Sequence, residues 1–155
     1  MKNKNILLIL LSVNLILVDQ LIKFVVCKYL YNSQAIAIKG FLNITYVENT
    51  GGAYGIASNN VAIFAIITAI LIALLIGYLM IRRRNINAWE KTSIISIISG
   101  GIGNLIDRVF RGFVVDYIDV NPIIKFPMFN FADILIVLGC ITLIINLILR
   151  KENGV

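Results

Sequence analysis

Four long apolar runs divide the chain into spans and connections. They cover about residues 6–26, 61–81, 92–106 and 134–149. Runs of this kind approach the ~20 residues that a helix needs to cross the hydrocarbon core of a bilayer. Only helices and closed barrels satisfy every backbone hydrogen bond in lipid. The pattern therefore predicts an α-helical integral membrane protein with four transmembrane helices.

Basic residues at the ends of these runs predict how the chain is oriented. They would all lie on one side of the membrane: Lys2, Lys4, Arg82, Arg83, Arg84, Lys91, Arg150 and Lys151. Short basic connections mark the cytoplasmic side, so we expect both termini and residues 82–91 there, and connections 27–60 and 107–133 outside. The N-terminus looks like a signal peptide, but its apolar run is too long and contains Asp19. We interpret it as a retained anchor.

The outer connection 27–60 contains a short alternating pattern. In AIAIKGFLNITYV, apolar residues alternate with small or polar ones around Lys39 and Gly40, which is typical of a β-hairpin. The glycines of the following ENTGGAYG, residues 48–55, indicate tight backbone or close approach to another group. We expect a small extracytoplasmic β-cradle or hairpin, within a single domain of residues 1–155.

Composition excludes a water-soluble globule. Of the 155 residues, 59% are hydrophobic and only 14% are charged, against about a quarter charged in soluble domains. The net charge of +6 comes from basic residues that cluster beside apolar runs, which favours membrane orientation over nucleic-acid binding. Histidine is absent, and Cys27 and Cys140 lack metal-ligand spacing. We therefore expect no metal ion or other cofactor, and lipid-facing or core positions for both cysteines.

Three aspartates from three spans are predicted to reach a similar depth. A helix rises 1.5 Å per residue, so Asp19, thirteen residues after Ile6, lies ~20 Å along the first span. Asp107 and Asp133 flank spans that rise only ~22–24 Å, which places them near the outer boundary. A charged carboxylate at mid-bilayer costs ~2.5–3.5 kcal/mol even on the gentler insertion scales. We expect these acids to surround one polar cavity open to the outer face, with Asp116 on the loop leading from it.

Polar residues near these acids have structural interpretations. Asp19 and Lys23 are four residues apart, in the favourable acid-then-base order on one helical face, and we expect an ion pair. Asp107 directly before Arg108 is consistent with a bidentate arginine–carboxylate clamp somewhere in the site. Asn104, one turn before Arg108, is placed to cap or orient a neighbour.

Small and aromatic residues have simpler interpretations. Gly100, Gly101 and Gly103, with Ser96 and Ser99, have the sizes that let membrane helices approach closely. We favour this packing role for the two serines over serine–lysine chemistry. The aromatic residues of the outer connection are expected at the membrane interface: Phe113, Tyr117 and Phe129.

Asp116 and Asp133 suit a catalytic pair. Asp116 lies between apolar residues in VVDYID, and Asp133 follows FPMFNFA at the start of a span. A helix N-terminus favours an ionised acid, and burial beside a second carboxylate favours a shared proton, which together are what peptide hydrolysis needs. Spacing alone leaves open a structural or proton-relay role. A small transporter or channel and a non-enzymatic scaffold are the rival classes, although no internal repeat typical of transporters is present.

An ordered set of motifs resembles a known family. The blocks are DQLIK at 19–23, ENTGGAYG at 48–55, GNLIDR at 103–108, VVDYID at 114–119 and FPMFNFAD at 126–133. Their order, their spacing and the four-span plan resemble the bacterial lipoprotein signal peptidases, also called signal peptidase II. The resemblance covers nearly the whole chain, and the set is far more specific than any one block.

The resemblance implies an aspartyl endopeptidase of the bacterial inner or plasma membrane. Such enzymes remove signal peptides from diacylglyceryl-modified prolipoproteins and cut before the lipidated cysteine. It implies catalytic roles for Asp116 and Asp133. The position of Asp133 at the start of a span makes it the slightly better base. The resemblance implies supporting roles for Asp19, Lys23, Asn49, Gly51, Asn104, Asp107, Arg108 and Asn130. It also implies a sheet-like cradle and sensitivity to the cyclic peptide globomycin. We expect contact with membrane lipids and, because one chain contains a complete site, function as a monomer.

Three positions depart from the family pattern. Gly52 replaces the usual alanine after NTG, and Ile134 follows the second aspartate where serine is common. Glu48 stands where many members carry arginine or an uncharged residue. None of these changes removes a catalytic group, but Glu48 would alter the charge at the cavity rim and, with it, substrate preference.

Overall fold

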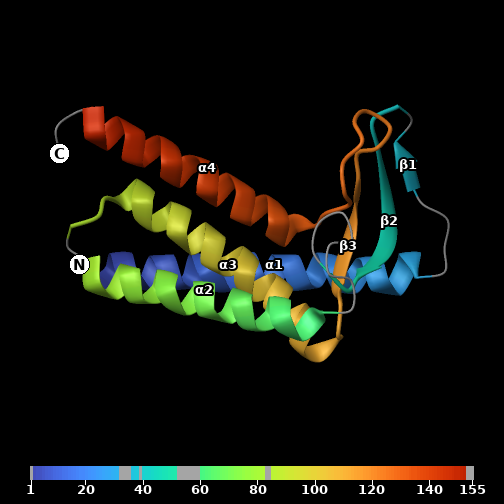
Figure 1. Ribbon diagram of the computed structural model, residues 1–155, viewed down its shortest axis with the longest axis horizontal. Helices are drawn as coiled ribbons and strands as arrows, with labels where there is room; N and C mark the ends of the chain where they lie inside the picture. The colour runs from blue at the N-terminus through green and yellow to red at the C-terminus, as the bar shows by residue number, and fades with distance from the viewer. Residues whose placement is uncertain (1, 32–35, 39, 52–59, 83–84, 153–155) are drawn as a thin grey trace.

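Four helices lie alongside one another, with a small sheet at one end. The computed structural model describes residues 2–31, 36–38, 40–51, 60–82 and 85–152. The helices are α1 Lys2–Leu30, α2 Val61–Arg82, α3 Ala88–Phe110 and α4 Phe131–Glu152, and the strands are β1 Ile36–Ile38, β2 Leu42–Asn49 and β3 Val114–Asp119. Both chain termini lie at the end of the bundle opposite the sheet (Figure 1).

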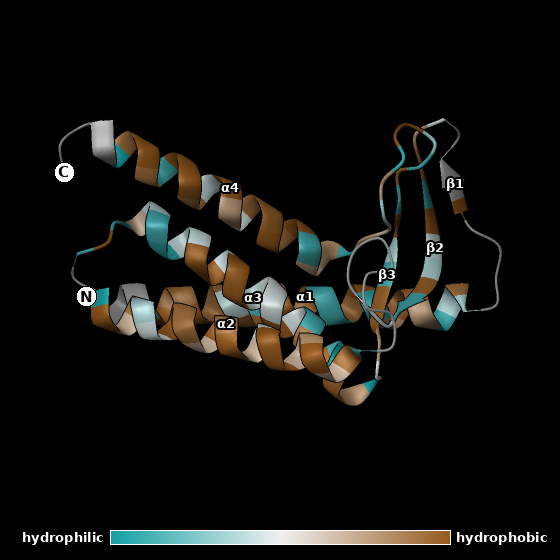
Figure 2. Ribbon diagram, in the orientation of Figure 1, coloured by the Kyte–Doolittle hydropathy of each residue, from teal (hydrophilic) through white to brown (hydrophobic). Residues whose placement is uncertain are grey.

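Every helix is long and apolar enough to cross a membrane. Figure 2 shows apolar positions along most of each helix. Helix α2 buries none of its side chains, which is expected for a helix surrounded by lipid. Half of the apolar window of α3 is buried, and α3 packs against the other three helices. The predicted four-span membrane fold with a small sheet is confirmed.

The predicted spans are too short at several ends. Helix α3 begins at Ala88 rather than residue 92, because Asn87 caps it by accepting the Glu90 backbone N–H over 2.7 Å. It also runs on to Phe110, so that Asp107 lies within the helix. Apolarity alone misses these turns because their charged side chains are bound by protein groups rather than exposed to lipid. Helix α1 likewise continues beyond the predicted end, to Leu30.

Small residues bring α3 and its neighbours together, as predicted. A Cβ on Gly100 would lie 2.3 Å from the backbone oxygen of Ala132, and one on Gly103 would lie 2.5 Å from an Asp19 oxygen. Ser96 donates to the backbone oxygen of Leu135 over 2.9 Å. These contacts set the separation of α3 from α1 and α4.

The sheet is larger than the predicted hairpin. The hairpin β1–β2 is present, with Gly40 at φ 75°, and β3 adds a third antiparallel strand beside β2. The sequence interpretation placed VVDYID on a loop, whereas it forms β3. Its register opposite β2 pairs Val47 with Asp116 and Asn49 with Val114. Asp116 is therefore held on a strand that is hydrogen-bonded to its neighbour.

Strand β3 is buried because it joins the sheet to the bundle. Val115 and Tyr117 pack against Val26 and Leu30 of α1. Tyr117 is thus a core residue, not an interfacial one, and its hydroxyl accepts the Phe131 backbone N–H over 3.0 Å. Burial of this strand fixes the sheet against the ends of α1 and α4. The predictions made for Lys39 and for residues 52–55 lie outside the described residues.

Candidate active site

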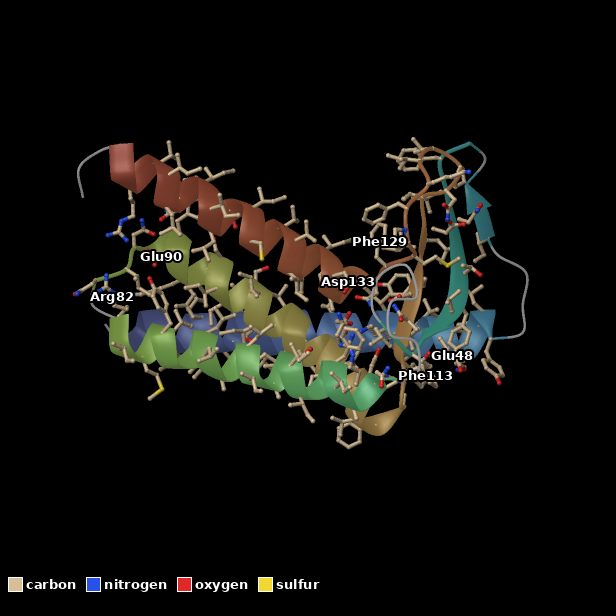
Figure 3. The ribbon with its side chains drawn as sticks, viewed as in Figure 1. Glu48, Arg82, Glu90, Phe113, Phe129 and Asp133 are labelled. Carbon is tan, nitrogen blue, oxygen red and sulfur yellow. The ribbon has the colours of Figure 1, made fainter. Side chains whose placement is uncertain are left out.

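A cavity of about 430 Å³ lies where β3 and the segment before α4 meet α3 and α4. Its polar wall is formed by Asn49, Gly51, Asn104, Arg108, Asp116 and Asp133, and the rest is apolar, from Val114, Phe126, Pro127, Met128, Phe129, Ile134, Val137 and Leu138. Figure 3 shows Asp133 at the sheet end of α4, with Phe129 nearby, and Glu90 and Arg82 at the far end of the helices. Asp116 and Asp133 therefore line one pocket whose other walls are mostly apolar, whereas the prediction that Asp19 and Asp107 also surround it is wrong.

Asp116 reaches the cavity from the middle of β3. Its Oδ2 accepts a hydrogen bond from Asn49 Nδ2 over 2.8 Å, and its Oδ1 accepts one from Asn130 Nδ2 over 2.7 Å. Burial raises the pKa of this carboxyl to about 6; the nearby Asp133 carboxylate adds to the rise, and the two amide donors oppose it. Asp116 therefore holds a proton to a higher pH than an ordinary aspartate does.

Asp133 lies in the first turn of α4. Asn104 Nδ2 donates to its Oδ1 over 2.7 Å, and the Asn130 backbone N–H donates to its Oδ2 over 3.1 Å. In return, the Asp133 backbone N–H donates to Asn130 Oδ1 over 3.0 Å, which forms a reciprocal helix cap. The positive end of the helix dipole also lies at this carboxylate, so the dipole and the two donors oppose the effect of burial on its charged form.

Asn130 links the two carboxylates. Its side-chain amide donates to Asp116, and its backbone N–H donates to Asp133. The same amide nitrogen lies 3.2 Å from Asn104 Oδ1. One fully buried asparagine therefore sets the position of both acids relative to each other, which is a stronger role than the sequence alone indicated.

Lys23 forms the buried centre of a network beneath the acids. Its ammonium nitrogen lies 2.9 Å from Asp19, 3.0 Å from Asp107 and 3.0 Å from Asn104 Oδ1. The predicted Asp19–Lys23 ion pair is present, and both of its side chains have no exposed surface. Because Asn104 in turn binds Asp133, the network connects α1 to a cavity carboxylate.

The two other acids of this network hold backbone next to the cavity. Asp19 Oδ1 accepts the Ala132 N–H over 3.1 Å, and Asp107 Oδ2 accepts the Val115 N–H over 3.1 Å. Ala132 directly precedes Asp133, and Val115 directly precedes Asp116. Asp19 and Asp107 therefore position the cavity acids without lining the cavity themselves.

The arginine partner of Asp107 is not its sequence neighbour. Arg108 donates to the Asn104 backbone oxygen over 3.4 Å, and its guanidinium lies 5.8 Å from the centre of the Phe64 ring. Arg111 instead pairs with Asp107 and also donates to Gln20 Oε1 over 3.1 Å. The sequence interpretation missed both Arg111 and Gln20, although the four-residue spacing of Asp107 and Arg111 could have indicated the pair.

Several residues outside the polar wall differ from expectation. Glu48 does not line the cavity; it is exposed on β2 and accepts the Tyr46 hydroxyl over 2.8 Å. Ile134 does line the cavity. Cys140 is exposed on α4, and Cys27 is partly buried beside the α1–sheet core. Within the described ranges, no three acidic or cysteine side chains are grouped as metal ligands.

Comparison with known proteins identifies the family. The family described as signal peptidase (SPase) II matches residues 11–149. The chain belongs to the signal peptidase II family. A lipoprotein signal peptidase of Clostridioides difficile is 41% identical over 149 residues, which cover 96% of this chain and 99% of that protein. One from Staphylococcus aureus (strain MRSA252) is 37% identical, covering 94% and 90%.

Solved structures agree with this assignment. A bacterial membrane enzyme determined by the in meso method at 2.3 Å matches with a TM-score of 0.85 and 35% identity, covering 94% of this chain and 90% of that one. A second, at 1.9 Å, matches with a TM-score of 0.79 and 36% identity, covering 90% and 91%. As a signal peptidase II family member with four membrane spans, the chain is a multi-pass membrane peptidase. This result favours the enzyme over the transporter and scaffold interpretations.

Proposed function

We propose that Asp116 and Asp133 are the catalytic dyad of an aspartyl endopeptidase that acts on diacylglyceryl-modified prolipoproteins. Family membership assigns the reaction class, the removal of signal peptides from prolipoproteins. The observation that carries the dyad is the Asn130 link, which holds both carboxylates at the wall of one cavity. Two linked carboxylates beside an apolar cleft suit hydrolysis of a peptide bond by a bound water.

Asp133 acts as the base and Asp116 as the acid. Both carboxyls are buried, but Asp133 also lies at the positive end of a helix dipole and accepts a backbone N–H, which stabilise its charged form; burial raises the pKa of Asp116 to about 6. Asp133 takes a proton from the water as the water oxygen attacks the scissile carbonyl carbon. Asp116 gives its proton to the carbonyl oxygen. When the tetrahedral intermediate collapses, Asp133 gives its proton to the leaving amine and Asp116 takes one back from a hydroxyl of the intermediate. One water and one peptide bond are consumed, and the dyad is restored.

The cavity also suggests how the substrate is placed. Its apolar wall continues along α4 through Val137 and Leu138, which are 54% and 53% exposed on the surface of a membrane-spanning helix. A diacylglyceryl chain that stays in lipid beside this wall holds the adjacent peptide at a fixed depth. The scissile bond is then already positioned near the site, instead of having to reach it by free diffusion. Asn49 and Arg108, on the polar wall, are placed to bind the substrate backbone.

The proposed orientation follows the basic residues of the sequence. Both termini lie at the end opposite the sheet (Figure 1), and Arg82 and Arg150 lie at the ends of α2 and α4. Basic flanks mark the cytoplasmic face, so the cavity faces the outer leaflet. All of the site residues come from one chain, and a monomer is therefore the proposed working form.

A cleavage assay with purified protein tests this function. The protein, reconstituted in lipid, is given a prolipoprotein with a diacylglyceryl cysteine and the same prolipoprotein without the lipid. We expect release of the signal peptide only from the lipidated form, with the new N-terminus at the lipidated cysteine. Equal cleavage of both forms, or a cut elsewhere, contradicts the proposed substrate, and no cleavage of either contradicts the function.

A further inference from the structure

One end of the sheet carries a group of exposed apolar side chains, of which only Phe126 lines the active-site cavity. The pairing of Asn43 with Asp119 brings the turn before β2 and the loop after β3 to the same end of the sheet. There Phe41 is 57% exposed, and Ile123 and Ile124 are 59% and 61% exposed. Phe126 is also about half exposed, and Lys125 lies between the apolar residues of the loop. We call this group, Phe41 and Ile123–Phe126, the sheet tip.

The sheet tip lies at the depth of the membrane interface. A hydrocarbon core of ~30 Å corresponds to ~20 helical residues, so a core that begins near Ile6 of α1 ends near Val26. The sheet packs against α1 at Val26 and Leu30. It therefore adjoins the boundary between acyl chains and headgroups rather than projecting into bulk water.

The direction of the strands places the tip beside the bundle. In Figure 1 the strands run across the helix axes, so their loop ends extend sideways from the helices rather than away from the membrane. Phe126 of the tip lines the same cavity as Val137 and Leu138 of α4. The apolar surface of the tip is thus continuous with the lipid-facing surface of a spanning helix.

From this geometry we propose that the sheet tip docks onto the outer-leaflet lipid surface. Its isoleucines and phenylalanines enter the boundary between headgroups and acyl chains, and the Lys125 ammonium binds a lipid phosphate. The acid that precedes the loop does not compete for Lys125 in the structure, since Asp119 is bound by Asn43 over 3.0 Å and by the Asn121 backbone N–H over 2.9 Å. Docking holds the cavity entrance at headgroup depth. The docking proposal does not depend on the assignment of the catalytic dyad.

Lipid quenching of a tryptophan at the tip tests this contact. Trp89 is the only tryptophan in the chain, so a Trp89→Phe, Ile124→Trp variant reports from the tip alone. The full chain is placed in nanodiscs of phosphatidylcholine and phosphatidylglycerol, with lipids brominated near the interface, and without substrate. We expect strong quenching by the brominated lipids, a blue-shifted emission and weak quenching by aqueous acrylamide, with an unfolding temperature close to that of Trp89→Phe.

The other outcomes overturn the proposal. Quenching by acrylamide but not by brominated lipid places the tip in water. Quenching by neither means that protein, such as a second copy of the chain, covers the tip. Adding Lys125→Glu to the reporter variant tests the phosphate contact: we expect bromolipid quenching to fall in nanodiscs rich in phosphatidylglycerol. Unchanged quenching there contradicts the role of Lys125.

Discussion

Asn130 donates its side-chain amide to Asp116 over 2.7 Å. This bond joins the segment before α4 to the middle of β3. The backbone of the same asparagine holds the carboxylate of Asp133. One buried residue therefore helps to set the position of both acids, together with the direct contact in which the Tyr117 hydroxyl of β3 accepts the Phe131 N–H of α4.

The pH dependence of cleavage reports the protonation of Asp116. If Asp116 is the acid, kcat/KM falls as pH rises through about 6, the pKa to which burial raises this carboxyl. Asn49→Leu removes a hydrogen bond that favours the charged form. The pKa of Asp116 then rises further, and the decline moves to higher pH. Kinetic profiles of lipidated-substrate cleavage measure both effects.

Asn43→Leu is the matched control for this experiment. Asn43 also donates to an aspartate of β3, but its partner is Asp119, a half-buried residue outside the cavity whose pKa is held below its usual value by this bond. The Asn43→Leu variant should leave the decline of kcat/KM near pH 6 unchanged. Activity that instead rises through this pH range would assign the base role to Asp116 and contradict our assignment.

Arg111 supports the site through Asp107. Arg111→Ala removes a partner from a fully buried carboxylate, and hydrogen bonds to charged groups contribute ~1.5–3 kcal/mol. Because the Arg111 side chain is 28% exposed, we expect a loss near ~1.5 kcal/mol in unfolding free energy. We also expect a lower kcat, because Asp107 holds the backbone beside Asp116. Lys28→Ala, at an exposed position on α1, should change neither unfolding nor kcat, and an equal effect there would refute this role.

Alanine substitutions at two helix glycines are predicted to have opposite effects on stability. Gly103→Ala places a methyl group 2.5 Å from an Asp19 oxygen, and overpacking of this kind costs ~1–3 kcal/mol. Gly77→Ala meets nothing within 4 Å, so it should be neutral or stabilising by up to ~1 kcal/mol. Thermal unfolding in detergent measures both. Equal unfolding temperatures for the two variants would show that the α1–α3 contact is looser than described.

A separate polar cluster joins the helices at the end of the bundle opposite the site. Buried Glu90 accepts hydrogen bonds from Tyr78 over 2.6 Å and from Arg150 over 2.8 Å. Arg150→Ala leaves a buried carboxylate without its cation, and we expect a loss of ~2–3 kcal/mol in unfolding free energy with little change in kcat. Adding Glu90→Gln should recover part of that loss, since the unpaired charge is then gone. A double variant less stable than Arg150→Ala alone would argue against this pairing.

The spans were predictable because each helix presents many apolar residues to lipid. Span ends were not, because apolarity gives no signal for turns such as the one at Glu90, whose charge is bound by Arg150 and Tyr78. Strand β3 was missed because VVDYID is buried by Val26 and Leu30 of α1, a contact distant in the sequence. Because β3 is buried, its sequence lacks the alternation of apolar and polar residues by which β1 and β2 were predicted.

Local pairs within a helix were also predictable, and tertiary pairs were not. The spacing of Asp19 and Lys23 indicated their ion pair. The adjacency of Asp107 and Arg108 suggested a clamp, but neighbouring helix residues point in different directions, and Arg111 one turn later is the partner. That Lys23 also reaches Asn104 on α3 depends on helix packing that no local pattern encodes.

The most direct test of the dyad is the cleavage rate of Asp116→Asn and Asp133→Asn, measured with a lipidated prolipoprotein. Both variants keep the size of the side chain, and unfolding temperatures establish that each protein is folded in the membrane mimic. We expect each variant to lose activity by ~10³-fold or more, since neither member of a dyad can act alone. Mature lipoprotein released at the wild-type rate by either folded variant would contradict the account.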